Sequence, residues 1–158
     1  MKKLLYITSL SGKRLNSFMK SAVVAAKNLG IDFTMACNTN MAEKNGYEKD
    51  CQEYGIKLKH IDFDRNPLSL KNFKAKLQLK KLMTEEKYDI VYCNTPIGGV
   101  LGRICANRTR IKHIIYQAHG FHFYRGGLLK IGLFTTQSSG YFQSIQSYLL
   151  QLQKKTMK

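Results

Sequence analysis

Residues 85–96 read EEKYDIVYCNTP, and this stretch decides the fold class. Its centre, Tyr88 to Cys93, is a short and nearly continuous apolar run, which is typical of a central parallel strand covered on both faces. Thr95 then suits the N-cap of a helix, and Pro96 suits its first turn. The stretch therefore predicts a buried strand that leads at once into a crossover helix.

The same alternation of β-rich runs and helical patterns extends from the first residue to residue 117. We expect strands at 4–8, 31–37, 56–61, 88–93 and 113–117, and helices at 15–29, 43–54, 69–87 and 95–105. This order predicts an α/β, Rossmann-like fold: a mostly parallel sheet of about five strands with helices on both faces. From residue 128 onward the apolar spacing fits neither helix nor strand for long, so we expect an irregular or helical C-terminal tail.

Composition narrows the class of protein and its partners. The 158 residues suffice for about one domain, and 26 Lys and Arg against 10 Asp and Glu give a net charge of +16, which attracts phosphates, nucleic acid or an anionic bilayer. An RNP-like phrase and a recognition helix are missing, so no specific nucleic-acid partner is expected.

The four cysteines form no C-x-x-C pair and are expected to be reduced core thiols. No signal peptide and no long apolar run are evident, which favours a cytoplasmic location.

Two loops that follow predicted strands carry small polar residues. In a parallel sheet such loops meet at the carboxyl ends of the strands, where ligands bind. Ser9, Ser11 and Gly12 follow the first strand in a segment that matches neither a Walker loop nor a G-x-G-x-x-G motif, so it is a ligand loop or an ordinary turn. After Asn94 and Thr95, the two glycines of Pro96-Ile97-Gly98-Gly99 indicate close approach either of a ligand or of a packed neighbour.

A third loop, AHGFHFYRGG at residues 118–127, follows the last predicted strand. His119, His122 and Arg125 lie among its glycines and make it rich in hydrogen-bonding groups. The pair His119-x-x-His122 lacks a third ligand at a recognisable spacing, so no metal is expected. Upstream, Arg65 either holds an anionic group or forms a solvated pair with Asp64.

Four phrases in order, KKLLYITSLSG, FDRNPLSLKN, EEKYDIVYCNTP and AHGFHFYRG, resemble the acceptor-side N-terminal domain of bacterial family-four glycosyltransferases. These are retaining enzymes of the GT-B type from exopolysaccharide and capsule biosynthesis, and the resemblance covers residues 1 to about 127. It implies a nucleotide sugar as co-substrate of the full-length family, with no cofactor in this chain. It also implies a lipid-linked saccharide acceptor and peripheral attachment to the anionic inner face of the cell membrane.

The resemblance also implies site residues. His119 resembles the histidine of the family's His-Gly pair. The resemblance implies that this histidine hydrogen-bonds the transferred sugar, so His119 is the expected catalytic residue. Thr95 and Pro96 resemble the end of a C-H-T-P segment, in which Asn94 replaces the histidine. Roles in binding at the cleft between acceptor and donor are implied for Ser9, Ser11, Gly12, Asn94, Thr95, Pro96, Gly120, His122 and Arg125.

The last part of the chain departs from the family. Residues 128–158 hold five Gln, four Ser and four Lys but no acidic residue. Dropping two bases from one choice of codons for Lys130 to Gly140 restores a family-like segment, N-W-L-I-Y-Y-P-V-E-W. We therefore expect an incomplete domain at 1–127 and a frame-shifted, non-native tail at 128–158 on a truncated gene, and hence no activity from the chain alone. The alternative is an acceptor- or lipid-binding module that acts with a separately encoded donor domain.

Overall fold

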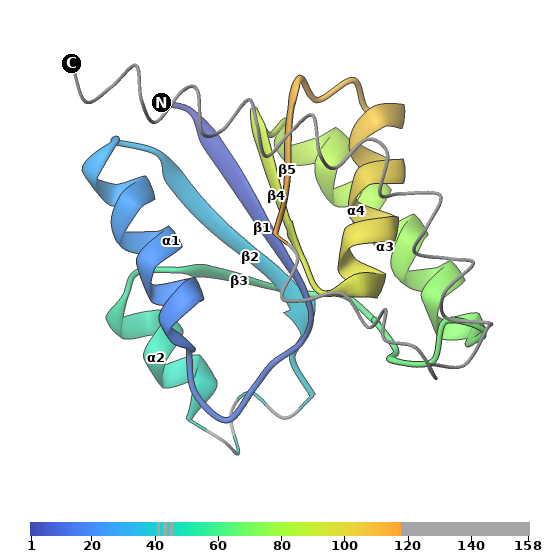
Figure 1. The fold of residues 1–158 in the computed structure, drawn as a ribbon, viewed down its shortest axis with the longest axis horizontal. Coiled ribbons are helices and arrows are strands. Elements are labelled where there is room, and N and C mark those ends of the chain that lie inside the picture. Colours follow the sequence, from blue (N-terminus) through green and yellow to red (C-terminus); the bar gives the residue numbers. More distant parts are fainter. Residues whose placement is uncertain (41, 43, 45, 118–158) are drawn as a thin grey trace, which may run out of the picture. The chain divides into compact units, whose positions relative to one another are not determined.

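The computed structural model describes residues 1–117 except 41, 43 and 45. These residues form a parallel sheet of five strands in the order β3-β2-β1-β4-β5 (Figure 1). The strands are β1 (Lys3–Leu10), β2 (Asp32–Asn38), β3 (Lys57–His60), β4 (Ile90–Asn94) and β5 (His113–Gln117). The helices are α1 (Ser17–Asn28), α2 (Tyr47–Glu53), α3 (Leu70–Glu86) and α4 (Pro96–Arg108).

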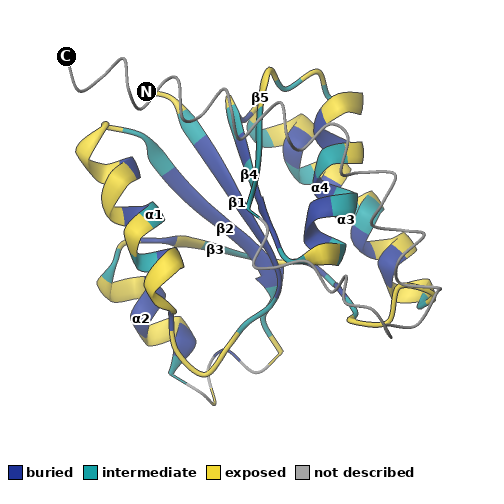
Figure 2. Cartoon of the chain, viewed as in Figure 1, coloured by how far each residue is buried: buried dark blue, intermediate teal, exposed yellow. Residues whose placement is uncertain are grey.

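Two apolar cores lie on opposite faces of this sheet. Alternate residues of a strand point to opposite faces, so Leu4 and Tyr6 of β1 join the core under α1 and α2, whereas Leu5 and Ile7 join the core under α3 and α4. Both sets are buried, as the dark central strands in Figure 2 show. Covering on both faces explains why β1 and β4 read as continuous apolar runs rather than as alternating ones.

The predicted fold class and the order of its elements are confirmed, with small differences at the ends. Helix α1 begins at Ser17 because Asn16 is its N-cap, with Asn16 Oδ1 accepting the Met19 N–H at 2.9 Å. Helix α4 continues past Cys105 to Arg108. All four cysteines are free and buried, as predicted. The predicted domain boundary at residue 127 and the tail at 128–158 lie outside the described residues.

Candidate functional site

The carboxyl ends of β1 and β4 are joined to the start of α4 by two hydroxyl groups. The Ser9 N–H donates to Thr95 Oγ1 at 3.1 Å, and the two hydroxyl oxygens lie 2.6 Å apart. The Gly98 N–H, in the first turn of α4, donates to Ser9 Oγ at 3.3 Å. The Thr95 side chain makes no cap hydrogen bond to its own helix. The free Gly98 N–H in the first turn of α4 is bonded instead by Ser9, which belongs to β1.

Thr95 holds an unusual backbone conformation at this junction. Its φ of 66° and ψ of 152° lie outside the regions that a β-branched residue normally adopts. Such a conformation costs roughly 1–3 kcal/mol and persists only where the surroundings impose it. Here the Thr95 N–H donates to Asn94 Oδ1 at 2.9 Å, and the Thr95 hydroxyl is held by Ser9. The strained residue is therefore fixed from both sides.

Asn94 supports this turn from inside the sheet edge. Its side chain donates from Nδ2 to the Tyr6 hydroxyl and accepts the Thr95 N–H, and the residue is only 2% exposed. Tyr6 is fully buried and stacks on Tyr92 with ring centroids 5.1 Å apart, and its burial raises the pKa of its hydroxyl to about 12. Both groups of the Asn94 amide are thus committed to Tyr6 and Thr95 in this structure.

Sequence reasoning missed the tyrosines and glutamine of this edge. The Tyr92 hydroxyl donates to Gln117 Oε1 at 2.8 Å, which extends the polar row to the end of β5. Tyr6 pairs in register with Tyr92, and Asn94 pairs with Gln117. The available signal was positional for Gln117, which ends its strand, whereas Tyr6 and Tyr92 lie in the middle of theirs and read as part of the apolar runs.

The loop between β1 and α1 is held by an ion pair with α2. Arg14 Nε lies 2.9 and 2.8 Å from the two Asp50 carboxylate oxygens, and Arg14 Nη2 lies 2.6 Å from Oδ1. Hydrogen bonds from Arg14 and from the Leu15 N–H lower the pKa of Asp50 to about 2. Within the loop, the Ser11 N–H donates to Asn38 O at 3.0 Å, and Gly12 is exposed. The cation of Arg14 is therefore used to fix the shape of the loop.

The glycines of α4 serve close packing against the sheet. A Cβ at Gly98 would lie 2.9 Å from Thr95 Oγ1, and one at Gly102 would lie 2.5 Å from Cys93 Sγ. A Cβ at Gly99 would overlap the ring of Tyr116. Of the two explanations that the sequence allowed for Gly98 and Gly99, the structure supports packed neighbours.

The segment before α3 is shaped by Asp64. Its carboxylate accepts the Asn66 N–H at 2.9 Å and the Ser69 hydroxyl at 3.0 Å. Arg65 is exposed and makes no ion pair within the described part of the chain. The solvated pair between Asp64 and Arg65 is thus not formed, and Arg65 is left exposed at the carboxyl edge.

The other predicted site residues are not part of the hydrogen-bonded junction of Ser9, Thr95 and Gly98. Pro96 is exposed at the first position of α4. His119, Gly120, His122 and Arg125 lie outside the described residues. Strand β5 ends at Gln117, so these residues follow in sequence from the strand end that is paired with Asn94. Among the described residues, no group of three or more potential ligands could hold a metal ion.

The two segments that meet at Ser9 and Thr95 offer neutral hydrogen-bonding groups. Segments 9–12 and 94–98 carry hydroxyl and amide side chains and contain no carboxylate or imidazole. Such groups suit binding to hydroxyl-rich ligands, whereas proton transfer near neutral pH needs a group of another kind. The arrangement can therefore bind and orient a ligand.

A model of the family described as Glycosyl transferase 4-like matches residues 3–152. The chain belongs to this family of glycosyltransferases. EpsD of Bacillus subtilis (strain 168), whose name assigns it to the glycosyltransferases, is 44% identical over 73 residues, which are 44% of this chain and 19% of EpsD. The UDP-Gal:alpha-D-GlcNAc-diphosphoundecaprenol alpha-1,3-galactosyltransferase of Escherichia coli is 39% identical over 59 residues, 37% of this chain and 15% of that enzyme.

The fold of this family member resembles that of a solved structure. MurG of Acinetobacter baumannii superposes with a TM-score of 0.54 at 18% identity, over 78% of this chain and 37% of MurG. This likeness concerns the fold alone. The chain matches less than a fifth of the length of either curated relative.

Proposed function

We propose that this chain is the acceptor-side domain of a retaining, nucleotide-sugar-dependent glycosyltransferase of polysaccharide biosynthesis, and that it does not transfer sugar by itself. The observation that carries the proposal is the junction of Ser9, Thr95 and Gly98 at the carboxyl edge, in a chain that belongs to a glycosyltransferase family. A strained turn that is held by hydrogen bonds at the ligand-binding edge of a parallel sheet supports a binding role. The proposed partner in transfer is a donor domain.

Residue roles follow the family resemblance. His119 is proposed to hydrogen-bond the transferred sugar and to be the catalytic residue of this half. Ser11 and Gly12 are proposed to face the phosphates of the nucleotide sugar, because their loop is small and is held in place by Arg14. The other proposed contacts at the cleft are Ser9, Asn94, Thr95, Pro96, Gly120, His122 and Arg125.

The proposed acceptor is a lipid-linked saccharide, as the printed name of the Escherichia coli relative describes for that enzyme. Helix α3 supports attachment to a membrane surface because it has two apolar faces. Ala75, Leu79 and Met83 are buried against the sheet, while an outer stripe is exposed. The stripe is formed by Leu70 (89% exposed), Phe73 (64%) and Leu77 (55%).

Lysines lie on both sides of this outer stripe. The helix carries Lys71, Lys74, Lys76, Lys80 and Lys81. An exposed apolar stripe flanked by cations is the pattern of a helix that lies on an anionic bilayer with its apolar side chains inserted. In the described part of the chain no helix has the length and apolarity to cross a bilayer. We therefore propose peripheral attachment through α3 on the cytoplasmic side.

Sedimentation with vesicles tests this attachment. The chain is expected to bind phosphatidylglycerol vesicles, and F73Q/L77Q is expected to weaken binding at least about tenfold because two apolar side chains no longer insert. A matched control, F18Q/L29Q, changes exposed apolar residues that are 51% and 74% exposed on the opposite face of the sheet. Equal binding by both variants would contradict the proposed surface.

A transferase assay tests the proposed function itself. The 158-residue chain is mixed with membranes and nucleotide sugars, beside a chain in which the coding sequence after residue 127 is restored to the alternative frame. We expect transfer only from the restored chain. Transfer by the 158-residue chain alone would refute the proposal. If the coding DNA holds no family-like segment in any other frame, the proposed frame shift is wrong.

The alternative function is an acceptor- or lipid-binding module that acts with a separately encoded donor domain. The same assay separates the two when a donor domain is added as a second polypeptide. Transfer after this addition favours the module, whereas transfer only from the restored single chain favours a truncated enzyme.

A further inference from the structure

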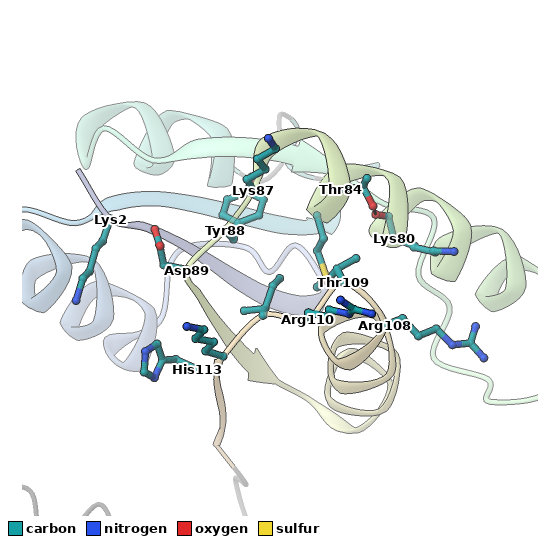
Figure 3. A pocket seen from close by; sticks show the side chains of 13 residues that line it. Lys2, Lys80, Thr84, Lys87, Tyr88, Asp89, Arg108, Thr109, Arg110 and His113 are labelled. Atoms are coloured by element: carbon teal, nitrogen blue, oxygen red, sulfur yellow. Dashed lines mark hydrogen bonds between the residues drawn. The ribbon is translucent and has the colours of Figure 1, made fainter.

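A hollow lies at the edge of the sheet opposite to Ser9 and Thr95, where the amino ends of β1, β4 and β5 meet the last turns of α3 and α4. It has a volume of about 670 Å³, and we call it the amino-edge pocket (Figure 3). Six of its lining residues are cations: Lys2, Lys80, Lys87, Arg108, Arg110 and Lys112. One lining residue, Asp89, is an acid.

The positive charge of this pocket is not neutralised by ion pairs. None of the six cations has an ion-pair partner within the described residues. The Asp89 carboxylate is engaged by the backbone instead, because its Oδ2 accepts a hydrogen bond from the Lys3 N–H at 2.8 Å. Like charges around one hollow repel each other, so the arrangement costs stability unless an anion binds there.

The backbone at the two helix ends supports a role for these side chains. Lys87 and Arg110 follow α3 and α4 with left-handed φ angles of 52° and 59°. Glycine is the residue best suited to such a position, and α1 and α2 are indeed followed by Gly30 (φ 64°) and Gly55 (φ 62°). The two helices that end at the pocket thus carry a cation where the other two helices carry glycine.

Compensation of helix dipoles is the simpler explanation for cations at helix C-termini. It accounts for one cation in the last turn of a helix, such as Lys27 in α1. It does not account for Lys2 and Lys112, which belong to neither helix, or for a cation at a position that favours glycine. The number and the placement of the charges both point to a ligand.

We propose that the amino-edge pocket binds a phosphate or diphosphate group. Guanidinium groups such as those of Arg108 and Arg110 match pairs of phosphate oxygens, and lysine ammonium groups add charge without demanding one geometry. The volume suits a small anion or a lipid headgroup. The site lies at the sheet edge away from Ser9 and Thr95, so it goes beyond the proposed transfer function and does not depend on it.

The variant K87G/R110G tests this proposal with the full chain and pyrophosphate as the probe. Glycine relieves both left-handed positions, so the melting temperature is expected to stay the same or rise. Titration calorimetry is expected to show pyrophosphate binding that weakens at least about tenfold in the variant, because two of the cations are lost, and that weakens as salt is added. A control, K27Q/K49Q, removes two exposed cations on the opposite face of the sheet and is expected to change affinity less than about twofold.

A second arm distinguishes the source of the phosphate. Vesicles containing phosphatidic acid are compared with phosphatidylglycerol vesicles of equal anionic content, to which α3 is proposed to bind, using the same three proteins. If K87G/R110G, but not the control, binds more weakly to phosphatidic acid and equally well to phosphatidylglycerol, while pyrophosphate binds to none of the proteins, the ligand is a lipid headgroup. Loss of pyrophosphate binding alone identifies a free phosphate compound. The proposal is overturned if neither probe binds the unaltered chain, or if both variants weaken binding equally.

Discussion

The substitution Gly102→Ala gives a direct test of how α4 is held against the sheet. Gly102 lies in the middle of α4 and is buried. An added Cβ would lie 2.5 Å from Cys93 Sγ and 2.9 Å from Ile7 Cδ1. Both distances are shorter than the roughly 3.5–4.0 Å of an ordinary contact between non-bonded heavy atoms, so the sheet or the helix must move.

Two effects of opposite sign determine how far Gly102→Ala should change the free energy of unfolding. Overpacking of a buried site costs about 1–3 kcal/mol, and alanine in a helix is about 1 kcal/mol more favourable than glycine. Cys93 is fully buried on the central strand β4, so the cost should lie near the upper end of its range. We expect the free energy of unfolding to fall by about 1–2 kcal/mol.

Urea denaturation followed by circular dichroism measures this change, and a double-mutant cycle identifies its cause. In the Cys93→Ala background the sulfur is absent, so Gly102→Ala should cost at least about 1 kcal/mol less than in the unaltered chain. The reasoning is refuted if Gly102→Ala is as stable as the unaltered chain. It is also refuted if the substitution costs the same in both backgrounds.

Two further predictions concern stability. Because hydrogen bonds from Arg14 lower the pKa of Asp50 to about 2, below its value of about 3.9 in an unfolded chain, this carboxylate stabilises the fold above about pH 4 and loses that effect as the pH falls toward 2. The difference in urea midpoint between the unaltered chain and Asp50→Asn should therefore shrink over this range, and a constant difference would count against the ion pair. Ser9→Ala should lower the free energy of unfolding by about 1–3 kcal/mol, because the buried Gly98 N–H loses its acceptor. Ser21→Ala, at an exposed position of α1, should stay within about 0.5 kcal/mol, and equal effects of the two substitutions would contradict the role of Ser9.

The order of the elements was predictable because each one carries its own local signal. The apolar run at Tyr88–Cys93 and the helical spacing of the segment before Gly30 each report a period that a short window of sequence contains. Helix ends were less predictable, because the cap at Asn16 and the extension of α4 to Arg108 depend on single hydrogen bonds and on packing.

The site was only partly predictable, because its bonds join residues that are distant in sequence. Ser9 and Thr95 are 86 positions apart, and they meet only because β1 and β4 are neighbours in the sheet. The sequence placed both residues at strand ends, but it could not provide the register that pairs Tyr6 with Tyr92 or commits Asn94 to Tyr6. The glycines of α4 were ambiguous for the same reason, since their neighbours come from other strands.

Strained backbone conformations occur at both edges of the sheet, at residues that the composition does not single out. Among the described residues, the non-glycine residues with positive φ are Lys87, Thr95 and Arg110. Thr95 lies at the proposed acceptor site, and the other two line the amino-edge pocket. The Thr95 hydroxyl bonds to Ser9, so this side chain has a structural role that glycine would lose. Lys87 and Arg110 make no ion pair within the described residues, and glycine would hold each of these two positions at a cost lower by roughly 1–3 kcal/mol. If these two cations had only structural roles, glycine would be the more stable choice at both positions. Their placement is therefore a physical argument for anion binding at the amino-edge pocket.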